Sequence, residues 1–388
     1  MSSPGHSSGP SGASGASVDR TASSSVVPVS EPPLTDQPLS EDPGPSSSSH
    51  PEPSAEINAD QSIEVDRSAD LDSAYGDSLY ATPRKLKGKQ RLMRNRHSDL
   101  TSLASSITRG VWEYGRRYHS YGRSQYAFPN DDAEAERLDM QHAMQTHLLG
   151  DRLFWAPIDP NPARVLDLGT GTGIWAIEFA DMFPSAVVTG TDLSAIQPDW
   201  VPPNCSFEID DAEAEWTWNE ASFDYIHNRN FVCAIRDWPK LIRQCYQFVK
   251  PGGWVEWHEK HPYLLSDDGS LPKDSALYQW GAKFFEASIE FGTDARSPQH
   301  LKRLMEEAGF VDVQEHILKL PVGPWAKDQR LKEVGLFETV NMTEGIQGLT
   351  IKLFTRCLHW TAAEVEAFLL QVRKDVKNRA IHSYYHLG

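Results

Sequence analysis

Residues 165–173 read Val-Leu-Asp-Leu-Gly-Thr-Gly-Thr-Gly, an apolar run of strand length that leads directly into a glycine-rich turn. Glycines in such a turn let the backbone approach a ligand closely, and we expect a helix over 174–183, ending before Pro184. The spacing is G-x-G-x-G, with Ile174 where a dinucleotide-binding fingerprint has its third glycine. Asp167 lies two residues ahead of the turn, and a carboxylate suits a cationic ligand better than a pyrophosphate.

Short β-rich runs alternate with helix-length segments from Val165 to Val255. This alternation is typical of a parallel sheet with helices on both faces, so we predict a Rossmann-like α/β fold. The expected strands are residues 164–168, 186–191, 205–209, 223–227 and 253–259, followed later in the chain by 311–320.

The expected helices show apolar side chains at helical spacing. Ser297-Pro298 supply an N-cap and a proline for the first position of one helix, which we expect to close at Gly309. Residues 325–385 are expected to be mostly helical. An earlier helix has the apolar stripe Leu241, Ile242, Cys245, Tyr246 and Val249, and we expect Gly252-Gly253 to end it.

The first part of the chain has a different composition. Of its first 60 residues, 32 are Ser, Pro or Gly, and residues 1–83 contain no apolar run able to offset the cost of backbone ordering. Residues 84–96 carry seven basic side chains and no acidic one, which fits either a nuclear import signal or a solvated linker. We therefore expect a disordered acidic tail over 1–104 and one folded domain over 105–388.

Charge and cysteine content exclude some partners. The net charge is −17, with −11 in residues 1–83 and +7 in residues 84–96, so the rest of the chain carries −13. An acidic body repels a phosphate backbone, and nucleic acid is not expected as a partner. The four cysteines form no C-x-x-C pair, so we expect no metal site. Without a secretory signal or a long apolar run, no membrane contact is expected, and the protein should be cytoplasmic and/or nuclear.

Three further strands end in polar side chains at the same edge of the sheet. Asp192 ends the second strand about 20 residues after the glycine turn, where a carboxylate can accept both hydroxyls of a ribose. Residues 210–213, Asp-Asp-Ala-Glu, follow the third strand, near where an adenine ring would lie. The fourth strand ends in residues 224–230, whose polar groups face the same crevice.

These segments resemble the successive motifs of class I S-adenosylmethionine-dependent methyltransferases. The closer resemblance is to the fungal LaeA-like, or TAM-domain, group, whose members include regulators of secondary metabolism and small-molecule methyltransferases. It covers about Ile107 to Tyr385. The residues that carry it are 113–119, 167–175, 190–194, 196–198, 210–213, 241–257 and 320–325.

The resemblance implies S-adenosylmethionine as cofactor and a seven-stranded sheet in the order 3-2-1-4-5-(7)-6, which is consistent with right-handed crossovers. It divides the domain into an N-terminal helical lid region (105–160), a cofactor-binding core (161–260), and acceptor-side helices with the sixth strand (261–388). The family usually finishes with a last strand after the segment that resembles 381–385. This chain ends at Gly388, so that strand is expected to have no sequence, and either the chain is truncated or its sheet is rebuilt.

By position, Gly169 and Gly171 are implied to line the methionyl part of the cofactor, and Asp167 to support its ammonium. Asp192 is implied to hold the ribose, and Asp211 with Ala212 to meet the adenine. Arg116 and Tyr118 are implied to close a lid. The full implied cofactor-binding set is Arg116, Tyr118, Asp167, Gly169, Gly171, Gly173, Asp192, Leu193, Asp211, Ala212 and Asn228.

Candidates for a general base lie at the end of the fifth strand, Glu256, His258 and Glu259, with His227 across the crevice. Such a base adds roughly 10²–10⁴-fold if the acceptor must lose a proton, whereas a carboxylate acceptor needs none. A core histidine is the simpler reading of His258. An apolar acceptor pocket could be lined by Trp280, Phe284, Phe285, Trp325 and Phe337, although helical aromatic residues more often belong to the core.

The sequence therefore predicts a methyltransferase that acts on a small molecule, such as a secondary metabolite, or on a protein. The alternative is a LaeA-like regulatory protein that acts through partner binding with little or no catalysis, using its tail and basic cluster. A nicotinamide-dependent oxidoreductase is disfavoured by the missing third glycine.

Overall fold

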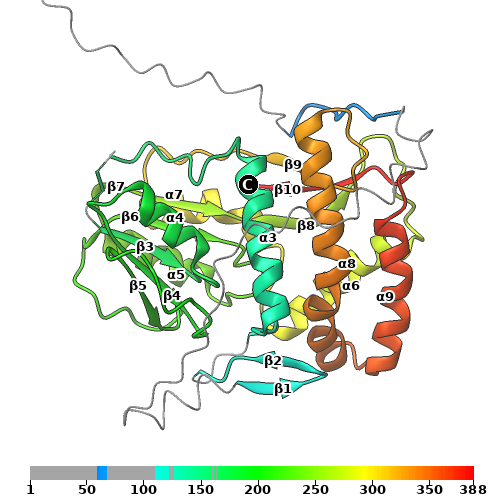
Figure 1. Ribbon diagram of the computed structural model, residues 1–388, viewed down its shortest axis with the longest axis horizontal. Coiled ribbons are helices and arrows are strands. Elements are labelled where there is room, and N and C mark those ends of the chain that lie inside the picture. The colour runs from blue at the N-terminus through cyan, green and yellow to red at the C-terminus, as the bar shows by residue number, and fades with distance from the viewer. Residues whose placement is uncertain (1–58, 68–109, 122–125, 160, 163) are drawn as a thin grey trace, which may run out of the picture. The chain divides into compact units, whose positions relative to one another are not determined.

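The computed structural model describes residues 59–67, 110–121, 126–159, 161–162 and 164–388 (Figure 1). All of them belong to one compact unit, Glu52–Gly388. The predictions for the basic cluster 84–96 and for most of the acidic tail fall outside the described residues. No helix in the described part of the chain has the length and apolar character needed to span a membrane.

The core is a parallel sheet in the order β5-β4-β3-β6-β7. The predicted strands are confirmed, and two of them have the predicted bounds, 164–168 and 205–209. The five strands are β3 (Arg164–Leu168), β4 (Val187–Asp192), β5 (Cys205–Ile209), β6 (Phe223–Arg229) and β7 (Val249–His258).

One helix boundary differs from its prediction. Helix α5 (Trp238–Phe248) ends four residues before Gly252, and β7 already begins at Val249, which has extended backbone angles. The glycine pair therefore does not end the helix but lies within the strand. A Cβ atom on Gly253 would lie 2.7 Å from the carbonyl oxygen of Asp224, so a glycine is needed there for the close approach of the chain.

Alternation along the strands places helices on both faces of this sheet. Val165 and Tyr225 pack against α4 (Ile174–Met182), whereas their neighbours Leu166 and Ile226 pack against α5. Helix α7 (Leu301–Ala308) lies on the α5 face, follows a 3-10 turn at Ser297–His300, and ends at Gly309 as predicted. The N-cap of the 3-10 turn is Arg296 rather than Ser297, the N-cap of α7 is His300, and neither residue caps with its side chain.

A second sheet contains β8 (Lys260–Leu265), β10 (Ser383–Leu387) and β9 (Leu318–Val322), in the order β8-β10-β9. The chain runs from β7 through Glu259 into β8, and the backbone of Glu259 exchanges hydrogen bonds of 2.7 and 3.0 Å with Gly388. The expectation that the last strand has no sequence is therefore wrong, because β10 itself lies antiparallel between β8 and β9. The parallel sheet follows the predicted order 3-2-1-4-5, and β10 lies next to β9 in the second sheet.

The sixth strand is shorter than predicted. Residues 311–317 form no strand, and β9 begins only at Leu318. On the side of β7 away from β6, no described strand pairs with it, and residues 311–316 lie across a cavity from β7 instead.

Four helices and a hairpin complete the fold. In Figure 1, α8 (Gln329–Cys357) runs between α3 (Asp132–Leu148) and the pair α6 (Ala276–Phe291) and α9 (Ala362–Val376). These helices and the β8-β10-β9 sheet share one apolar core. The lid region 105–160, predicted to be helical, contains only one helix among its described residues. It also contains the hairpin of β1 (Val111–Glu113) and β2 (Arg116–Tyr118), because Tyr114 and Gly115 both adopt positive φ angles and form a two-residue turn.

Residues 59–67 fall in the stretch expected to be disordered, yet they are packed. Val65 forms an antiparallel bridge with Ala326, and the side chain of Ile63 is only 6% exposed. Composition averaged over the tail concealed these two apolar side chains, which alternate with acidic ones.

Candidate functional site

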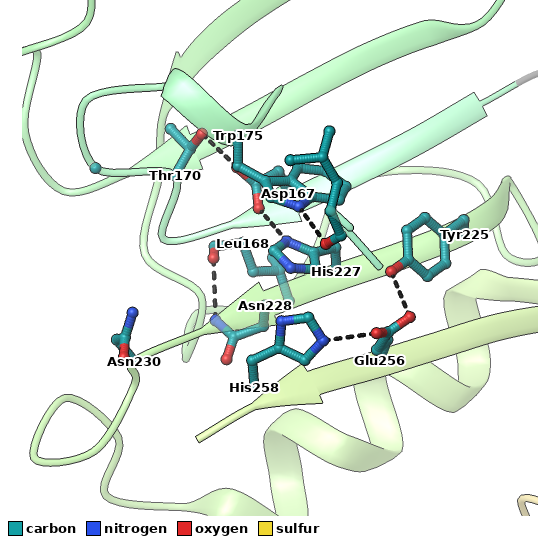
Figure 2. Close-up of polar contacts among 12 residues, drawn as sticks. Asp167, Leu168, Thr170, Trp175, Tyr225, His227, Asn228, Asn230, Glu256 and His258 are labelled. Carbon is teal, nitrogen blue, oxygen red and sulfur yellow. Dashed lines mark hydrogen bonds and ion pairs between the residues drawn. The ribbon is translucent and has the colours of Figure 1, made fainter. Parts of the chain in front are cut away.

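A row of polar side chains crosses the parallel sheet at one level. The strand register places Gly190, Asp167, His227 and Glu256 beside one another on β4, β3, β6 and β7. Residues paired in this way point to the same face of a sheet, here the face covered by α4. Trp175 of α4 stacks on the His227 ring, with 3.6 Å between the ring centroids (Figure 2).

Asp167 is held inside this row. Its Oδ2 accepts a hydrogen bond of 2.5 Å from the Thr170 hydroxyl, and its Oδ1 lies 2.7 Å from Nδ1 of His227. Burial raises the pKa of Asp167 to about 6 and lowers the pKa of His227 well below its usual value. Both groups have partners within the protein. Neither lines the cavity of about 130 Å³ that lies beside the glycine turn. The cofactor role of Asp167 and the catalytic role of His227 stay predictions.

Glu256 connects its own strand, β7, to β6 and to a loop. It accepts hydrogen bonds from the Tyr225 hydroxyl and from the backbone amides of Trp155 and Ala156, each at 2.8 Å. His258 Nε2 lies 2.6 Å from its Oε1, as Figure 2 shows. Burial alone would raise the pKa of Glu256, but its His258 and amide partners lower it to about 2. A carboxylate with four donors fastens the chain to the sheet, and its catalytic role, like that of His258, stays a prediction.

A cavity of about 130 Å³ lies at the carboxyl ends of β3, β4 and β5. The predicted cofactor residues that line it are Gly169, Gly171, Asp192, Leu193, Asp211 and Ala212. It also receives one face of α3, from Glu134, Leu138 and His142, which are four residues apart. The structure thus brings together the glycine turn and the carboxylates of the two following strands, as the sequence predicted.

Asp192 fixes the glycine turn from the neighbouring strand. Its Oδ2 accepts a hydrogen bond of 2.9 Å from the Gly171 amide, and its Oδ1 accepts one of 2.8 Å from the Ser194 amide. Gln197 donates to the Gly171 carbonyl oxygen at 2.6 Å. Burial raises the pKa of Asp192 to about 6. Each carboxylate oxygen can accept a second hydrogen bond, so the group can also bind hydroxyls of a ligand.

The remaining predicted cofactor residues lie outside this cavity lining. Gly173 is the N-cap of α4, and the Asn228 amide donates to the Leu168 carbonyl oxygen at 3.0 Å. Arg116 binds Asp131 at 2.6 and 2.8 Å, and Tyr118 is buried beneath Lys352. The Arg116–Asp131 pair fixes the start of α3, whose next turn reaches the cavity. Their direct contact with the cofactor stays a prediction.

The contribution of α3 to the cavity was not predicted from the sequence. Asp131 caps this helix by accepting from the Glu134 amide, and Asn130 donates to Ser194 at 3.1 Å, which ties the helix to the β4 end. The signal was present, since Asn130-Asp131 before an acidic first turn is typical of a helix start. That start would have placed Glu134, Leu138 and His142 on one face.

Arg229 is a second cavity residue that the sequence did not predict individually. It ends β6 and lines the cavity, and within the described part of the chain no hydrogen bond or ion pair engages its guanidinium. Burial lowers its pKa to about 10, against the stabilising charges of Asp167, Glu178 and Asp139. The other charged side chains in the lining are carboxylates: Glu134, Asp192, Asp210, Asp211 and Glu213. The cavity therefore favours a cationic ligand with one anionic group.

Glu259, the remaining base candidate, is fully buried and accepts from the Phe231 amide at 2.7 Å and the Val232 amide at 2.9 Å. Burial raises its pKa to about 8. The folded protein therefore keeps this proton up to about pH 8, whereas the unfolded chain loses it near its ordinary value of 4.5. Between these values the free energy of unfolding falls as the pH rises, by up to roughly 1.4 kcal/mol per pH unit.

We expect this slope to disappear in Glu259→Gln, which cannot ionise. The variant loses one acceptor and is less stable than wild type at pH 5, and this difference shrinks as the pH rises because only wild type loses stability. The measurement is urea unfolding of both proteins at pH 5, 6.5 and 8. If the free energies of unfolding of the two proteins change in parallel across this pH range, the carboxyl of Glu259 is not buried and protonated.

A larger cavity of about 810 Å³ lies between β7 and residues 309–316. Glu256, His258 and Glu259 line this cavity rather than the one at the glycine turn. The five aromatic residues considered for an acceptor pocket line neither cavity and belong to, or pack against, the helical core. The larger cavity holds none of the glycine-turn residues, so size does not identify the ligand site.

Comparison with known proteins supports a common chemistry. Residues 140–315 match a family model described as a methyltransferase domain. Methyltransferase pytC of Aspergillus terreus is 43% identical over 289 residues, which are 74% of this chain and 89% of that protein. Secondary metabolism regulator LAE1 of Cochliobolus heterostrophus is 37% identical over 278 residues, 70% of this chain and 91% of that protein. Among solved structures, phosphoethanolamine N-methyltransferase 2 of Haemonchus contortus has a TM-score of 0.36 at 18% identity, covering 65% of this chain and 51% of that one.

Proposed function

Because this chain belongs to the class I S-adenosylmethionine-dependent methyltransferases, in the fungal LaeA-like group, we propose that it methylates a small-molecule acceptor of secondary metabolism. The observation that carries this proposal is the cavity in which the glycine turn, Asp192 and Asp211 meet. Its carboxylates suit the sulfonium and ammonium charges of the cofactor. The greater identity to a relative named as a methyltransferase than to one named as a regulator supports catalysis.

When bound, S-adenosylmethionine supplies a methyl group whose carbon bonds to an acceptor lone pair as its bond to sulfur breaks, leaving S-adenosylhomocysteine. The residues of this chain hold the cofactor in place. Asp192 accepts the ribose hydroxyls, Asp211 and Ala212 meet the adenine, and Gly169 and Gly171 let the backbone approach the methionyl part. Holding donor and acceptor at attack distance can lower the barrier by up to about 7–11 kcal/mol.

Arg229 fits the carboxylate of the methionyl part. No described residue makes a hydrogen bond or ion pair with its guanidinium, and such a group at a ligand cavity is suited to a bidentate carboxylate contact. We expect Arg229→Gln to weaken S-adenosylhomocysteine binding about tenfold, the effect of one hydrogen-bonded charge pair. The matched control is Arg164→Gln, which removes an exposed arginine at the other end of the sheet.

Isothermal titration with decarboxylated S-adenosylhomocysteine isolates this contact. The wild type should prefer the intact ligand, and Arg229→Gln should bind the two ligands nearly equally. An unchanged preference in the variant assigns the carboxylate to other residues.

The experiment that tests the function uses methyl-labelled S-adenosylmethionine with the small-molecule and protein fractions of a fungal extract. We expect label in the small-molecule fraction, none with Asp192→Ala, and full transfer by a chain that lacks residues 1–57. This deletion stops before Ala59 because residues 59–67 pack on the domain. Label in the protein fraction alone would reject the acceptor class.

The second candidate function is regulation through partners, which the likeness to LAE1 favours. It expects the reverse result, with function lost on removal of residues 1–57 and kept in Asp192→Ala. The acidic composition and the basic cluster 84–96 support protein partners for the tail, a cytoplasmic and/or nuclear location, and no nucleic acid partner.

A further inference from the structure

Residues 59–67 lie across the chain that leads from β9 to α8, and are drawn in blue in Figure 1. Val65 and Ala326 form an antiparallel bridge. On either side of it, the Asp66 amide donates to the Trp325 carbonyl oxygen and the Lys327 amide to the Glu64 carbonyl oxygen, both at 2.8 Å. The segment thus pairs with a backbone edge of the domain through a single bridge.

Ile63 anchors this segment. Its side chain belongs to the buried helical core, and its amide lies 3.4 Å from Oδ2 of Asp267. That carboxylate is itself held by Lys319 at 2.8 and 3.0 Å and by the Tyr384 hydroxyl at 2.7 Å. The acceptor of the segment is therefore fixed by β9 and β10 and does not depend on the segment for its position.

Charge completes the fit. Glu64 pairs with Lys327 at 2.7 Å, and Asp66 pairs with Lys332 in the first turn of α8. The side chains alternate, with Ile63 and Val65 toward the core and Glu64 exposed. The surface that this segment covers therefore fits an extended chain whose residues alternate between apolar and acidic.

We propose that residues 59–66 are a detachable docking segment, and that the groove formed by Asp267, Trp325–Lys327 and Lys332 is a binding site for an acidic peptide of this pattern. One buried side chain and a few hydrogen bonds must offset the conformational entropy lost when eight residues become ordered. The free energies of the attached and released states are therefore close. The ligand of the groove is the chain's own segment. Because this segment is covalently attached, its effective concentration is high, and it outcompetes free peptides of the same chemistry.

The test uses the full chain and a fluorescent peptide of residues 58–67. Ile63→Asp removes the anchor from the chain's own segment and vacates the groove. We expect the peptide to bind Ile63→Asp at least tenfold more tightly than wild type, measured by fluorescence anisotropy. Adding Lys327→Glu and Lys332→Glu to Ile63→Asp should weaken this binding about tenfold.

Ser62→Asp is the matched control, because it adds the same charge at the neighbouring exposed position and should leave the groove occupied. Hydrogen exchange provides a second readout, since the Asp66 amide should exchange slowly in wild type and Ser62→Asp and rapidly in Ile63→Asp. Equal peptide binding to wild type and Ile63→Asp, no binding to either, or equal exchange of the Asp66 amide in both overturns the proposal. None of these measurements depends on methyl transfer.

Discussion

Asp192→Ala is expected to weaken S-adenosylmethionine and S-adenosylhomocysteine binding by at least 100-fold and to abolish methyl transfer. Hydrogen bonds from ribose hydroxyls to a carboxylate are worth about 1.5–3 kcal/mol each, and 1.4 kcal/mol is tenfold in affinity. Removing the carboxylate also leaves the Gly171 and Ser194 amides without their acceptor, which frees the glycine turn. Isothermal titration of both ligands measures the effect.

Asp224→Ala is the matched control for this variant. Asp224 is also a carboxylate in the sheet, and it accepts from the Arg164 amide at 2.8 Å and from Lys250 at 2.7 Å, but it lies at the opposite end of its strand. This variant should lose stability and bind the cofactor normally. If Asp192→Ala binds as tightly as wild type while remaining folded, then the cavity at the glycine turn is not the cofactor site and the proposed function fails with it.

Gly169→Ala is expected to destabilise the protein by about 2–5 kcal/mol and to impair cofactor binding. Gly169 has a φ angle of +62°, which costs an L-residue about 1–2 kcal/mol. A Cβ atom there would lie 1.9 Å from the Phe231 ring, and overpacking of this kind costs about 1–3 kcal/mol. The ring cannot move freely, because Phe231 is buried and its amide is bound to Glu259.

Two comparisons separate strain from collision. Gly269→Ala has a similar φ angle of +72° with no atom within 4 Å of the added carbon, so it should show the backbone cost alone. In the Phe231→Ala background, Gly169→Ala should cost no more than Gly269→Ala costs in wild type, because the colliding ring is gone. The measurement is urea unfolding of all variants. Equal losses for Gly169→Ala in both backgrounds would remove Phe231 from the explanation.

The cofactor-binding half of the fold was open to prediction because its signals are local. A buried parallel strand must be apolar, and a turn that approaches a ligand must contain glycine, so residues 164–173 indicate strand, turn and helix by themselves. Asp192 could be predicted in the same way, because it is a carboxylate at the end of the next apolar strand. The last strand was misjudged for the opposite reason. Residues 383–387 carry no pattern that distinguishes a strand from the helices around them. They form β10 by pairing with β8 on one side and β9 on the other.

By itself, the amino-acid sequence determined the α/β core and the residues of the glycine turn, since each depends on neighbours along the chain. Its resemblance to a known family implied the methyltransferase chemistry. Only the tertiary structure decided which polar groups face the ligand. Asp167, His227 and Glu256 have the same pleat face as Asp192 but lie two residues further from the carboxyl edge of the sheet, beneath α4, where Thr170, Trp175 and Tyr225 engage them. Packing in space likewise brought α3 to the cavity and placed the Ile63 amide beside Asp267, which is 204 residues away in sequence.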